Sequence, residues 1–171
     1  MSNRPLINLD EVPLESHAHG MRFEASTGAI APLIGARKLG YRLVVVPAGK
    51  CAWPYHLHHV NEEMFFILDG SGTLRLGDAR YPVRAGDVIA APPGMGRAHQ
   101  LINTSDRELR YLAVSTMEAP DVFEYPDSGK FGVFAGAAPG AETGRTFSYF
   151  GRQDSELDYW AGEDERADES G

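Results

Sequence analysis

The chain has 171 residues and a formal net charge of −8. This length is typical of one domain, and a chain of this size buries roughly 70% of its unfolded surface. Nucleic acids and anionic membranes both require a basic patch, and the sequence contains no cluster of Lys and Arg. We therefore expect a small-molecule ligand or substrate, with no nucleic acid and no membrane as partner.

The ends of the chain and its one cysteine carry little further information. The N-terminal residues lack the basic and then apolar pattern of a signal peptide, and the apolar runs are far shorter than a membrane span. A cytoplasmic location is the default expectation. Cys51 has no second cysteine to pair with, so an internal disulfide is excluded.

Short apolar runs separated by turn residues predict an all-β fold. Residues 1–40 are polar and irregular, and we expect either edge strands or an arm that covers the barrel or a partner. Glycine-containing turns at 69–72 and 77–79 and a polar turn at 103–108 predict hairpins. Strands at this spacing favour a sandwich or barrel, and closure into a jelly roll would remove exposed edges. The clearest predicted strands cover residues 41–46, 63–68, 73–76, 87–91 and 109–116.

These patterns divide the chain into four segments. Residues 1–40 form the N-terminal arm or edge strands, and residues 41–118 form the barrel core. From Pro120 onward, aromatic residues recur among Asp, Pro and Gly without a clean period, so residues 119–160 are predicted to wrap around the barrel. Residues 161–171 are acidic and nearly devoid of apolar side chains, which predicts a disordered tail.

A group of histidines and a carboxylate is the strongest functional signal. His56 and His58 alternate with Leu57, so on a strand both side chains lie on one face. Glu63 opens an apolar run that we expect to pair with the histidine strand. A lone histidine is usually a core or surface residue with one hydrogen bond. Here a His-x-His pair and a glutamate lie between two glycines, and His99 lies in a second glycine-bounded segment, which together favour one bound metal.

Other candidates compete for these positions. Glu62 competes with Glu63, because a β-bulge near the turn could exchange them, although the spacing to the next glycine favours Glu63. His59 is out of phase with the pair, so we expect it to be exposed or to contact a ligand from outside. His17 and His19 repeat the same spacing, but no carboxylate follows them, and a solvated loop is the better interpretation.

The two segments resemble the two motifs of the cupin superfamily. Residues 49–70 contain Gly, His-x-His, Glu and Gly, and residues 86–103 contain Gly, Pro-x-Gly, His and Asn in the same order as the family. Gly49 lies one residue further from the first histidine than usual, and four residues separate His99 from Gly94 instead of two. These departures concern loop conformation more than the types of ligand.

The resemblance implies a single cupin barrel, a double-stranded β-helix that binds metal through His56, His58, Glu63 and His99. Residues 121–134 and 158–160 look like a group of uncharacterised bacterial single-domain cupins for which no reaction is established. Cupin-like barrels commonly pair, and the N-terminal arm offers an edge to exchange, so we also expect a homodimer.

Three imidazoles and one carboxylate suit a divalent transition metal: Fe, Mn, Ni, Co, Cu or Zn. Four protein ligands on an octahedral ion leave two positions for water or a chelating substrate, which is typical of catalytic sites. We therefore rank first a metal-dependent enzyme that acts on a small sugar, carboxylate or carbonyl compound by isomerisation, lyase or dioxygenase chemistry. A non-catalytic binding or sensing barrel and a homo-oligomer with a stabilising metal are the alternatives.

Residues that would complete such a site are less sharply marked. The 125–130 segment is polar enough for a lid, but its chemistry favours a simple turn. The candidates for a general acid or base are Tyr55, Glu62 and Tyr111. The candidates for substrate contact are Phe65, Arg97 and Lys130.

Overall fold

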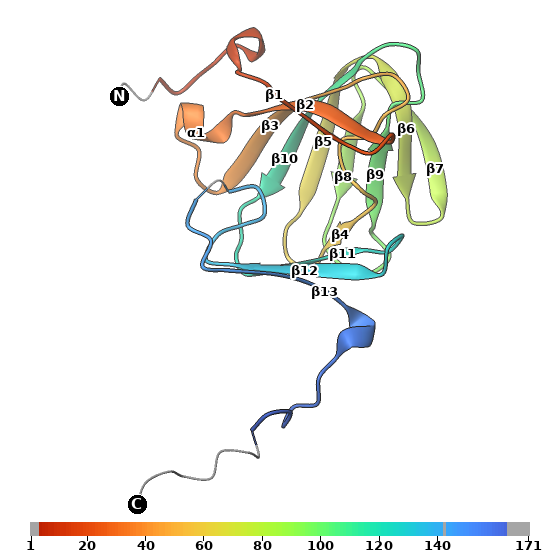
Figure 1. The fold of residues 1–171 in the computed structure, drawn as a ribbon. Helices are drawn as coiled ribbons and strands as arrows, with labels where there is room; N and C mark the ends of the chain where they lie inside the picture. Colours follow the sequence, from red (N-terminus) through yellow and green to blue (C-terminus); the bar gives the residue numbers. More distant parts are fainter. Residues whose placement is uncertain (1–3, 142, 164–171) are drawn as a thin grey trace, which may run out of the picture.

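Three antiparallel sheets make up the computed structural model, which describes residues 4–141 and 143–163, and the main apolar core lies between the first two (Figure 1). Strands dominate and the only helices in these residues are one or two turns long, so the predicted all-β fold is confirmed. No helix of the described chain is long and apolar enough to cross a membrane.

The largest sheet has six strands in the order β1-β2-β3-β10-β5-β8. The second sheet has the order β7-β6-β9, and the third has the order β13-β12-β11-β4. The strands of the first sheet are β1 (Glu15–His19), β2 (Phe23–Ala29), β3 (Leu39–Val46), β10 (Leu109–Thr116), β5 (Glu63–Asp69) and β8 (Val88–Ala91). Those of the second are β7 (Ala79–Arg84), β6 (Ser71–Leu76) and β9 (His99–Ile102). Those of the third are β13 (Phe147–Arg152), β12 (Lys130–Ala135), β11 (Asp121–Tyr125) and β4 (Leu57–His58). The helical elements are α1 (Ala31–Ile34) and the 3-10 turns Leu9–Glu11 and Gln153–Ser155.

The core forms because successive side chains on a strand point to opposite faces. On β3, Val44 and Val46 belong to the main buried cluster between the sheets, whereas Leu43 packs on the other face with Val12 and Ile30. Short β-branched and aromatic strands of this kind close their edges by curling into a barrel. The even-numbered residues of β3 therefore face the barrel interior.

Each of the five strands predicted from apolar runs is present, but three predicted pairings are wrong. The histidine strand β4 pairs with β11, where Phe123 lies opposite His58, and β5 pairs instead with β10 and β8. The turn at 69–72 joins strands of two different sheets, as does the turn at 103–108. Of the three predicted turns, only the one at 77–79 closes a hairpin, with Leu76 opposite Ala79. Closure of the barrel pairs β4, β5 and β9 with strands that are distant in the sequence, which local turn chemistry does not report.

The first 40 residues extend the six-stranded sheet. β2 pairs with β3, and β1 pairs with β2 at the outer edge, where its five side chains are all exposed. His17 and His19 therefore lie on an exposed strand, although we expected a loop. The division of the chain at residues 40, 118 and 160 stays a prediction. Most of the predicted disordered tail, residues 164–171, lies outside the described residues.

Gly70 marks the crossover between two sheets and tests this topology. Its φ of +82° is left-handed, and a Cβ there would overlap the backbone oxygen of Glu108. Gly86 is also left-handed, at +94°, but a Cβ there has open space around it. We expect Gly86→Ala to lose about 1–2 kcal/mol from backbone strain, and Gly70→Ala to lose a further ~1–3 kcal/mol from overpacking. Urea unfolding followed by circular dichroism measures both, and equal losses would contradict the crossover.

Candidate metal centre

Three separate segments bring the histidines and Glu63 together. His58 lies on β4 and Glu63 begins β5, while His99 begins β9. His56 and His99 lie opposite each other in an antiparallel bridge: the His56 N–H donates to the His99 carbonyl at 3.1 Å, and the His99 N–H donates to the His56 carbonyl at 2.7 Å. Because two backbone hydrogen bonds fix this pair, the two imidazoles leave the chain side by side, with ring centroids 4.6 Å apart.

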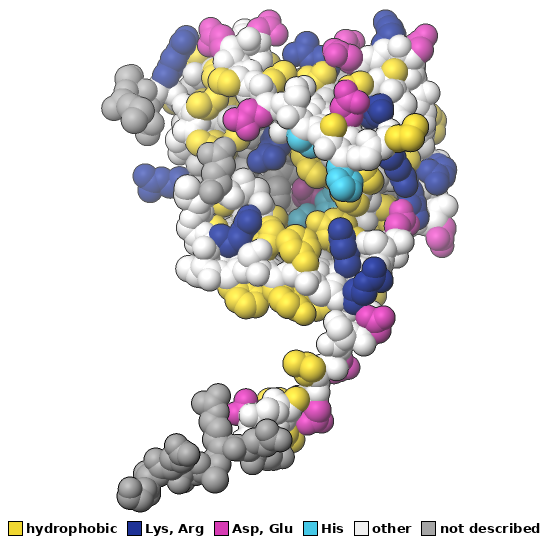
Figure 2. All heavy atoms as spheres, in the orientation of Figure 1, with side chains coloured by type: hydrophobic (Ala, Val, Ile, Leu, Met, Phe, Trp, Pro, Cys, Tyr) yellow, Lys and Arg dark blue, Asp and Glu magenta, His cyan; other side chains and the backbone are white. Residues whose placement is uncertain are grey.

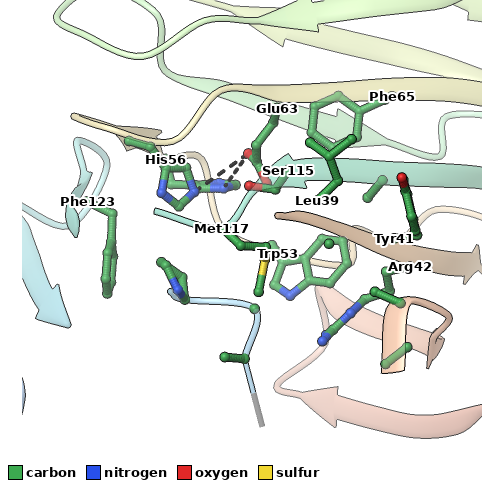
Figure 3. Close-up of a pocket in the computed structure, with 18 of the residues that line it drawn as sticks. Leu39, Tyr41, Arg42, Trp53, His56, Glu63, Phe65, Ser115, Met117 and Phe123 are labelled. Carbon is green, nitrogen blue, oxygen red and sulfur yellow. Dashed lines mark ion pairs between the residues drawn. The ribbon is translucent and has the colours of Figure 1, made fainter. Parts of the chain in front are cut away.

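The ligand atoms converge on one carboxylate oxygen. Glu63 Oε2 lies 2.9 Å from His99 Nε2 and 3.6 Å from Nε2 of both His56 and His58. The ligand atoms of His56, His58 and Glu63 all lie within 4.8 Å of one another, and His99 joins this group through its contact with Glu63. We call these four residues the histidine cluster. Figure 3 shows His56 and Glu63 at one side of a cavity, with dashed lines for the ion pairs.

Each imidazole uses its Nδ1 atom outside the cluster. Nδ1 of His56 lies 2.8 Å from the Pro54 carbonyl oxygen, Nδ1 of His99 lies 3.2 Å from the Arg97 carbonyl oxygen, and Nδ1 of His58 lies 2.7 Å from Oδ2 of Asp121. These oxygens only accept hydrogen bonds, so Nδ1 carries the proton in all three rings. In the neutral imidazole, Nε2 therefore presents a lone pair to the cluster.

Four acceptor atoms thus face one point, and their lone pairs repel one another unless a cation lies among them. A proton on His99 would satisfy one contact with Glu63 and leave the other two imidazoles without a donor. A divalent transition metal accepts all four lone pairs at once, and imidazole nitrogens with one carboxylate oxygen are a donor set that such ions bind. The residues present therefore fit a metal centre.

Charge and burial around Glu63 agree with a cation site. Burial alone would raise the pKa of Glu63, but its close contacts with His56 and His99 and the nearby His58 hold this pKa well below its usual value. Burial lowers the pKa of His56 despite Glu63. Burial also works to lower the pKa of His58, yet Asp121 and Glu63 raise it overall. A carboxylate that stays ionised beside a neutral His56 is the protonation state that a metal requires.

Asp121 anchors the cluster from outside, and sequence reasoning missed this role. Its buried carboxylate accepts hydrogen bonds from His58 Nδ1, from the Asn61 side-chain amide at 2.8 Å and from the Val60 N–H at 3.2 Å. The pairing of β11 with β4 places Asp121 there, across 63 residues of sequence from His58. No local spacing links the two residues, so the missing signal was the strand pairing itself.

The competing residues lie outside the cluster. The Glu62 side chain is exposed and its backbone N–H donates to Thr116 Oγ1, so Glu63 is the carboxylate in the group. His59 is exposed and its Nε2 lies 2.6 Å from Glu124 Oε1. His59 and Glu124 therefore form a second histidine–carboxylate pair on the other face of the same two strands.

A cavity of about 530 Å³ opens on the histidine cluster. The space-filling view shows it as a hollow with histidine side chains inside (Figure 2). Its apolar wall includes Trp53, Phe65, Met117, Phe123 and Phe134. An apolar cavity with a few polar groups at one end is the usual form of a small-molecule site.

The cavity separates the remaining sequence candidates. Phe65 and Tyr111 line it, whereas Tyr55, Glu62, Arg97 and Lys130 are not among its lining residues. Tyr55 donates to the Gly77 carbonyl at 3.2 Å and supports the Arg75 guanidinium, which binds both oxygens of Asp127 in the β11–β12 turn. The Lys130 ammonium lies over the Tyr125 ring.

The cavity also contains one polar residue that we did not single out from the sequence, Arg42, and one that begins the 125–130 segment considered as a lid, Tyr125. Arg42 and Tyr125 line it, and Tyr125 lies on β11 with its ring 6.2 Å from that of His56. Burial raises the pKa of the Tyr111 and Tyr125 hydroxyls, so both keep their protons at neutral pH. The periodicity of β3 could have indicated Arg42, because it shares a face with Val44 and Val46.

Comparison with known proteins agrees with this fold. Residues 42–115 match the model of the cupin domain family. A proposed sugar phosphate isomerase from Acidithiobacillus ferrooxidans superposes with a TM-score of 0.76 at 23% identity, covering 92% of this chain and 97% of that chain. A cupin-superfamily sugar phosphate isomerase from Silicibacter pomeroyi gives 0.74 at 22% identity, covering 88% and 94%. The predicted double-stranded β-helix is therefore confirmed.

Two curated relatives match parts of the chain. An uncharacterised protein of Methanocaldococcus jannaschii, MJ1618, is 32% identical over 71 residues, or 42% of this chain. Auxin-binding protein 1 of Arabidopsis thaliana is 27% identical over 130 residues, or 70% of this chain. The matches span 54% and 63% of the lengths of these relatives.

Asp121→Asn tests the outer support of the cluster. The amide of asparagine is a weaker acceptor for His58 Nδ1–H, so we expect metal affinity to fall about 10–100-fold while the fold is retained. Glu124→Gln is the matched control, because Glu124 contacts His59 on the same strand pair but not the cluster. Competition with a fluorescent chelator measures both affinities. An equal loss in the two variants would contradict the role of Asp121.

Proposed function

We propose that the chain is a cupin and a metal-dependent enzyme that acts on a small oxygenated molecule by isomerisation, lyase or dioxygenase chemistry. The match of residues 42–115 to the cupin domain family supports the first part. The observation that carries this proposal is the convergence of three imidazole Nε2 atoms and Glu63 Oε2 at the wall of the cavity. A metal buried away from any cavity would serve stability alone, whereas this cluster is accessible to a ligand of substrate size.

The side chains in and around the cluster have different roles in such a reaction. His56, His58, Glu63 and His99 would hold the metal, which polarises a bound carbonyl or carboxylate as a Lewis acid and lowers the pKa of bound water. Trp53 and Phe65 lie on the cavity wall, where they exclude water from the ligand. Tyr111 and Tyr125 stay protonated because burial raises the pKa of both hydroxyls, so each can donate a hydrogen bond to a ligand oxygen.

The proton-transfer groups favour some chemistries over others. Among the described residues that line the cavity, Glu63 is the one carboxylate, and it is committed to the cluster. A reaction assisted mainly by polarisation and by tyrosine proton donors is consistent with isomerisation or with a lyase reaction. Dioxygenation would require Fe, Mn, Ni or Cu instead of Zn. Two structural relatives bear the name sugar phosphate isomerase, which supports the isomerase within this group.

A non-catalytic binding barrel is the second candidate. The lack of a second carboxylate among the described lining residues favours it, because a ligand that is only bound requires no general base. Auxin-binding protein 1 is a relative named for binding. The two proposed functions require the same metal and the same cavity. They differ in whether the bound ligand is chemically converted.

Metal content tests the centre directly. We expect protein purified without chelator to contain close to one transition metal per chain, and His56→Ala and His99→Ala each to lose it while keeping an all-β circular dichroism spectrum. His59→Ala is the matched control and should keep its metal, because His59 contacts Glu124 instead of the cluster. Elemental analysis by mass spectrometry gives the stoichiometry and the element.

The same measurement directs the search for activity. Fe, Mn, Ni or Cu would justify an oxygen-consumption screen, and Zn would indicate Lewis-acid chemistry. Proton NMR of sugar phosphates and hydroxy acids incubated with the metal-loaded protein then separates an enzyme from a binding barrel. Metal retained in the His99 variant would refute the ligand set.

We also propose a homodimer, formed through the outer strand of the four-stranded sheet. β13 is the edge of this sheet, and Phe147, Tyr149 and Phe150 are each about half exposed. Figure 2 shows hydrophobic side chains along this side of the molecule. A second copy of β13 can pair antiparallel with the first about a two-fold axis, which satisfies the open edge and covers the aromatic rings. The edge strand β1 of the six-stranded sheet is less suitable for such pairing, because its exposed side chains are mostly polar.

Sedimentation tests this pairing. We expect a dimer at micromolar concentration and a shift toward monomer in Phe147→Lys, because the two copies would place like charges together at the edge. Val88→Lys is the control, since Val88 is 69% exposed on β8 at the edge of the six-stranded sheet. A wild-type monomer at micromolar concentration would remove the proposal.

A further inference from the structure

We propose that Arg42 forms an anion-binding subsite at the end of the cavity away from the histidine cluster. The ligand would then carry two polar ends: oxygen atoms that reach the cluster, and a phosphate or carboxylate that binds Arg42. This inference rests on the proposed function, because it names the substrate class of the same cavity. It assigns a role to a residue that lies outside both histidine motifs.

The position of Arg42 on β3 directs its side chain into the barrel. Val44 and Val46 belong to the buried cluster between the sheets, and Arg42 shares their face because alternate strand residues do. Arg42 is partly buried and lines the cavity together with Trp53 and Tyr41. In the view of Figure 3, the Trp53 indole lies between His56 and Arg42.

The sheet register sets the distance between the two ends. Arg42 lies opposite Ala113 on β10, and Ala113 lies opposite Phe65 on β5, two residues beyond Glu63. Arg42 is therefore two strands from the strand that bears the carboxylate, or about 9–10 Å at the usual strand spacing. Ala113 lies between the two ends in the register and lines the cavity with only a methyl group, which leaves room there for a ligand of a few carbon atoms.

The guanidinium is available for a ligand. Within the part of the chain that the structure describes, Arg42 makes no ion pair and no side-chain hydrogen bond. Arg75, by comparison, binds Asp127 through two nitrogens, and Arg22 donates to Gln100. A guanidinium on an apolar wall favours an anion, and its planar geometry matches a carboxylate or phosphate with two parallel hydrogen bonds.

The net charge of the cavity also favours an anionic ligand. A divalent cation with one carboxylate and three neutral imidazoles leaves a charge of about +1 at the cluster. Arg42 adds a second positive charge, and Arg37 also lines the cavity. The chain as a whole has a formal charge of −8, so this interior is opposite in sign to the molecule. An anionic small molecule is therefore the ligand that the cavity selects.

Titration with matched small anions tests the subsite. The probes are 2-phosphoglycolate and succinate, which carry a second anionic group, and glycolate, which carries none. By isothermal calorimetry on metal-loaded protein, we expect wild type to bind at least one of the first two about tenfold or more tightly than glycolate. Tight binding of 2-phosphoglycolate alone indicates a phosphate ligand, and tight binding of succinate indicates a carboxylate.

Two variants decide whether Arg42 is responsible. Arg42→Met should remove the preference for the second anionic group and leave glycolate affinity unchanged, and Arg42→Lys should keep part of it. Arg97→Met is the control, because Arg97 precedes the cluster but does not line the cavity. A preference that survives in Arg42→Met, that is lost in Arg97→Met, or that is missing from the wild type would overturn the inference.

Failure of the proposed function gives a different result. If wild type and all variants contain no metal by elemental analysis, the metal-dependent reaction is wrong. The ratio of 2-phosphoglycolate to glycolate affinity still reports on Arg42 in that case, because the second anionic group contacts the guanidinium and not the cluster. If the wild type retains its metal but shows no preference for the second anionic group, the metal centre stands and only the subsite is removed.

Discussion

Three hydrogen bonds from imidazole Nδ1 atoms determine what the histidine cluster can do. Each one ends on an oxygen that only accepts, so each ring presents an Nε2 lone pair to Glu63. Two of these oxygens are backbone carbonyls two residues before the histidine, and the third is the buried carboxylate of Asp121. Four acceptors facing one point would repel, so this arrangement requires a cation. The rest of the fold keeps these acceptors in place.

The barrel achieves this by joining segments that are distant in the sequence. The backbone bridge between His56 and His99 sets the spacing of two rings, and the pairing of β4 with β11 brings Asp121 to His58. Burying the Glu63 and Asp121 carboxylates costs free energy, which a hydrophobic core would not require. Local rules of stability are commonly violated at functional sites. The cavity lies next to these carboxylates, so the buried charges that cost free energy are close to the space that a ligand can enter.

The sequence predicts the strands and the cluster better than their connections. Apolar runs indicated the five main strands because alternation is a local property. The spacing of His56 and His58 indicated that both side chains lie on one face of a strand, and Glu63 marked the start of the next run. The turn at 69–72 predicted a hairpin, but Gly70 leads β5 of one sheet to β6 of another. Asp121 was missed because its contact with His58 depends on the pairing of β4 with β11, and no local pattern encodes that pairing. Arg42 was missed for a different reason: the alternation along β3 does indicate its face, but we did not follow it to that residue.

Anomalous X-ray diffraction from crystals of metal-loaded protein, recorded at the absorption edge of the metal found, tests the central claim most directly. The account predicts one strong peak among Nε2 of His56, His58 and His99 and a Glu63 carboxylate oxygen, at coordination distances of about 2.0–2.3 Å. It also predicts that each Nδ1 keeps its outer oxygen partner. A metal bound elsewhere, or a cluster in which Glu63 bridges protonated imidazoles under saturating metal, would contradict it.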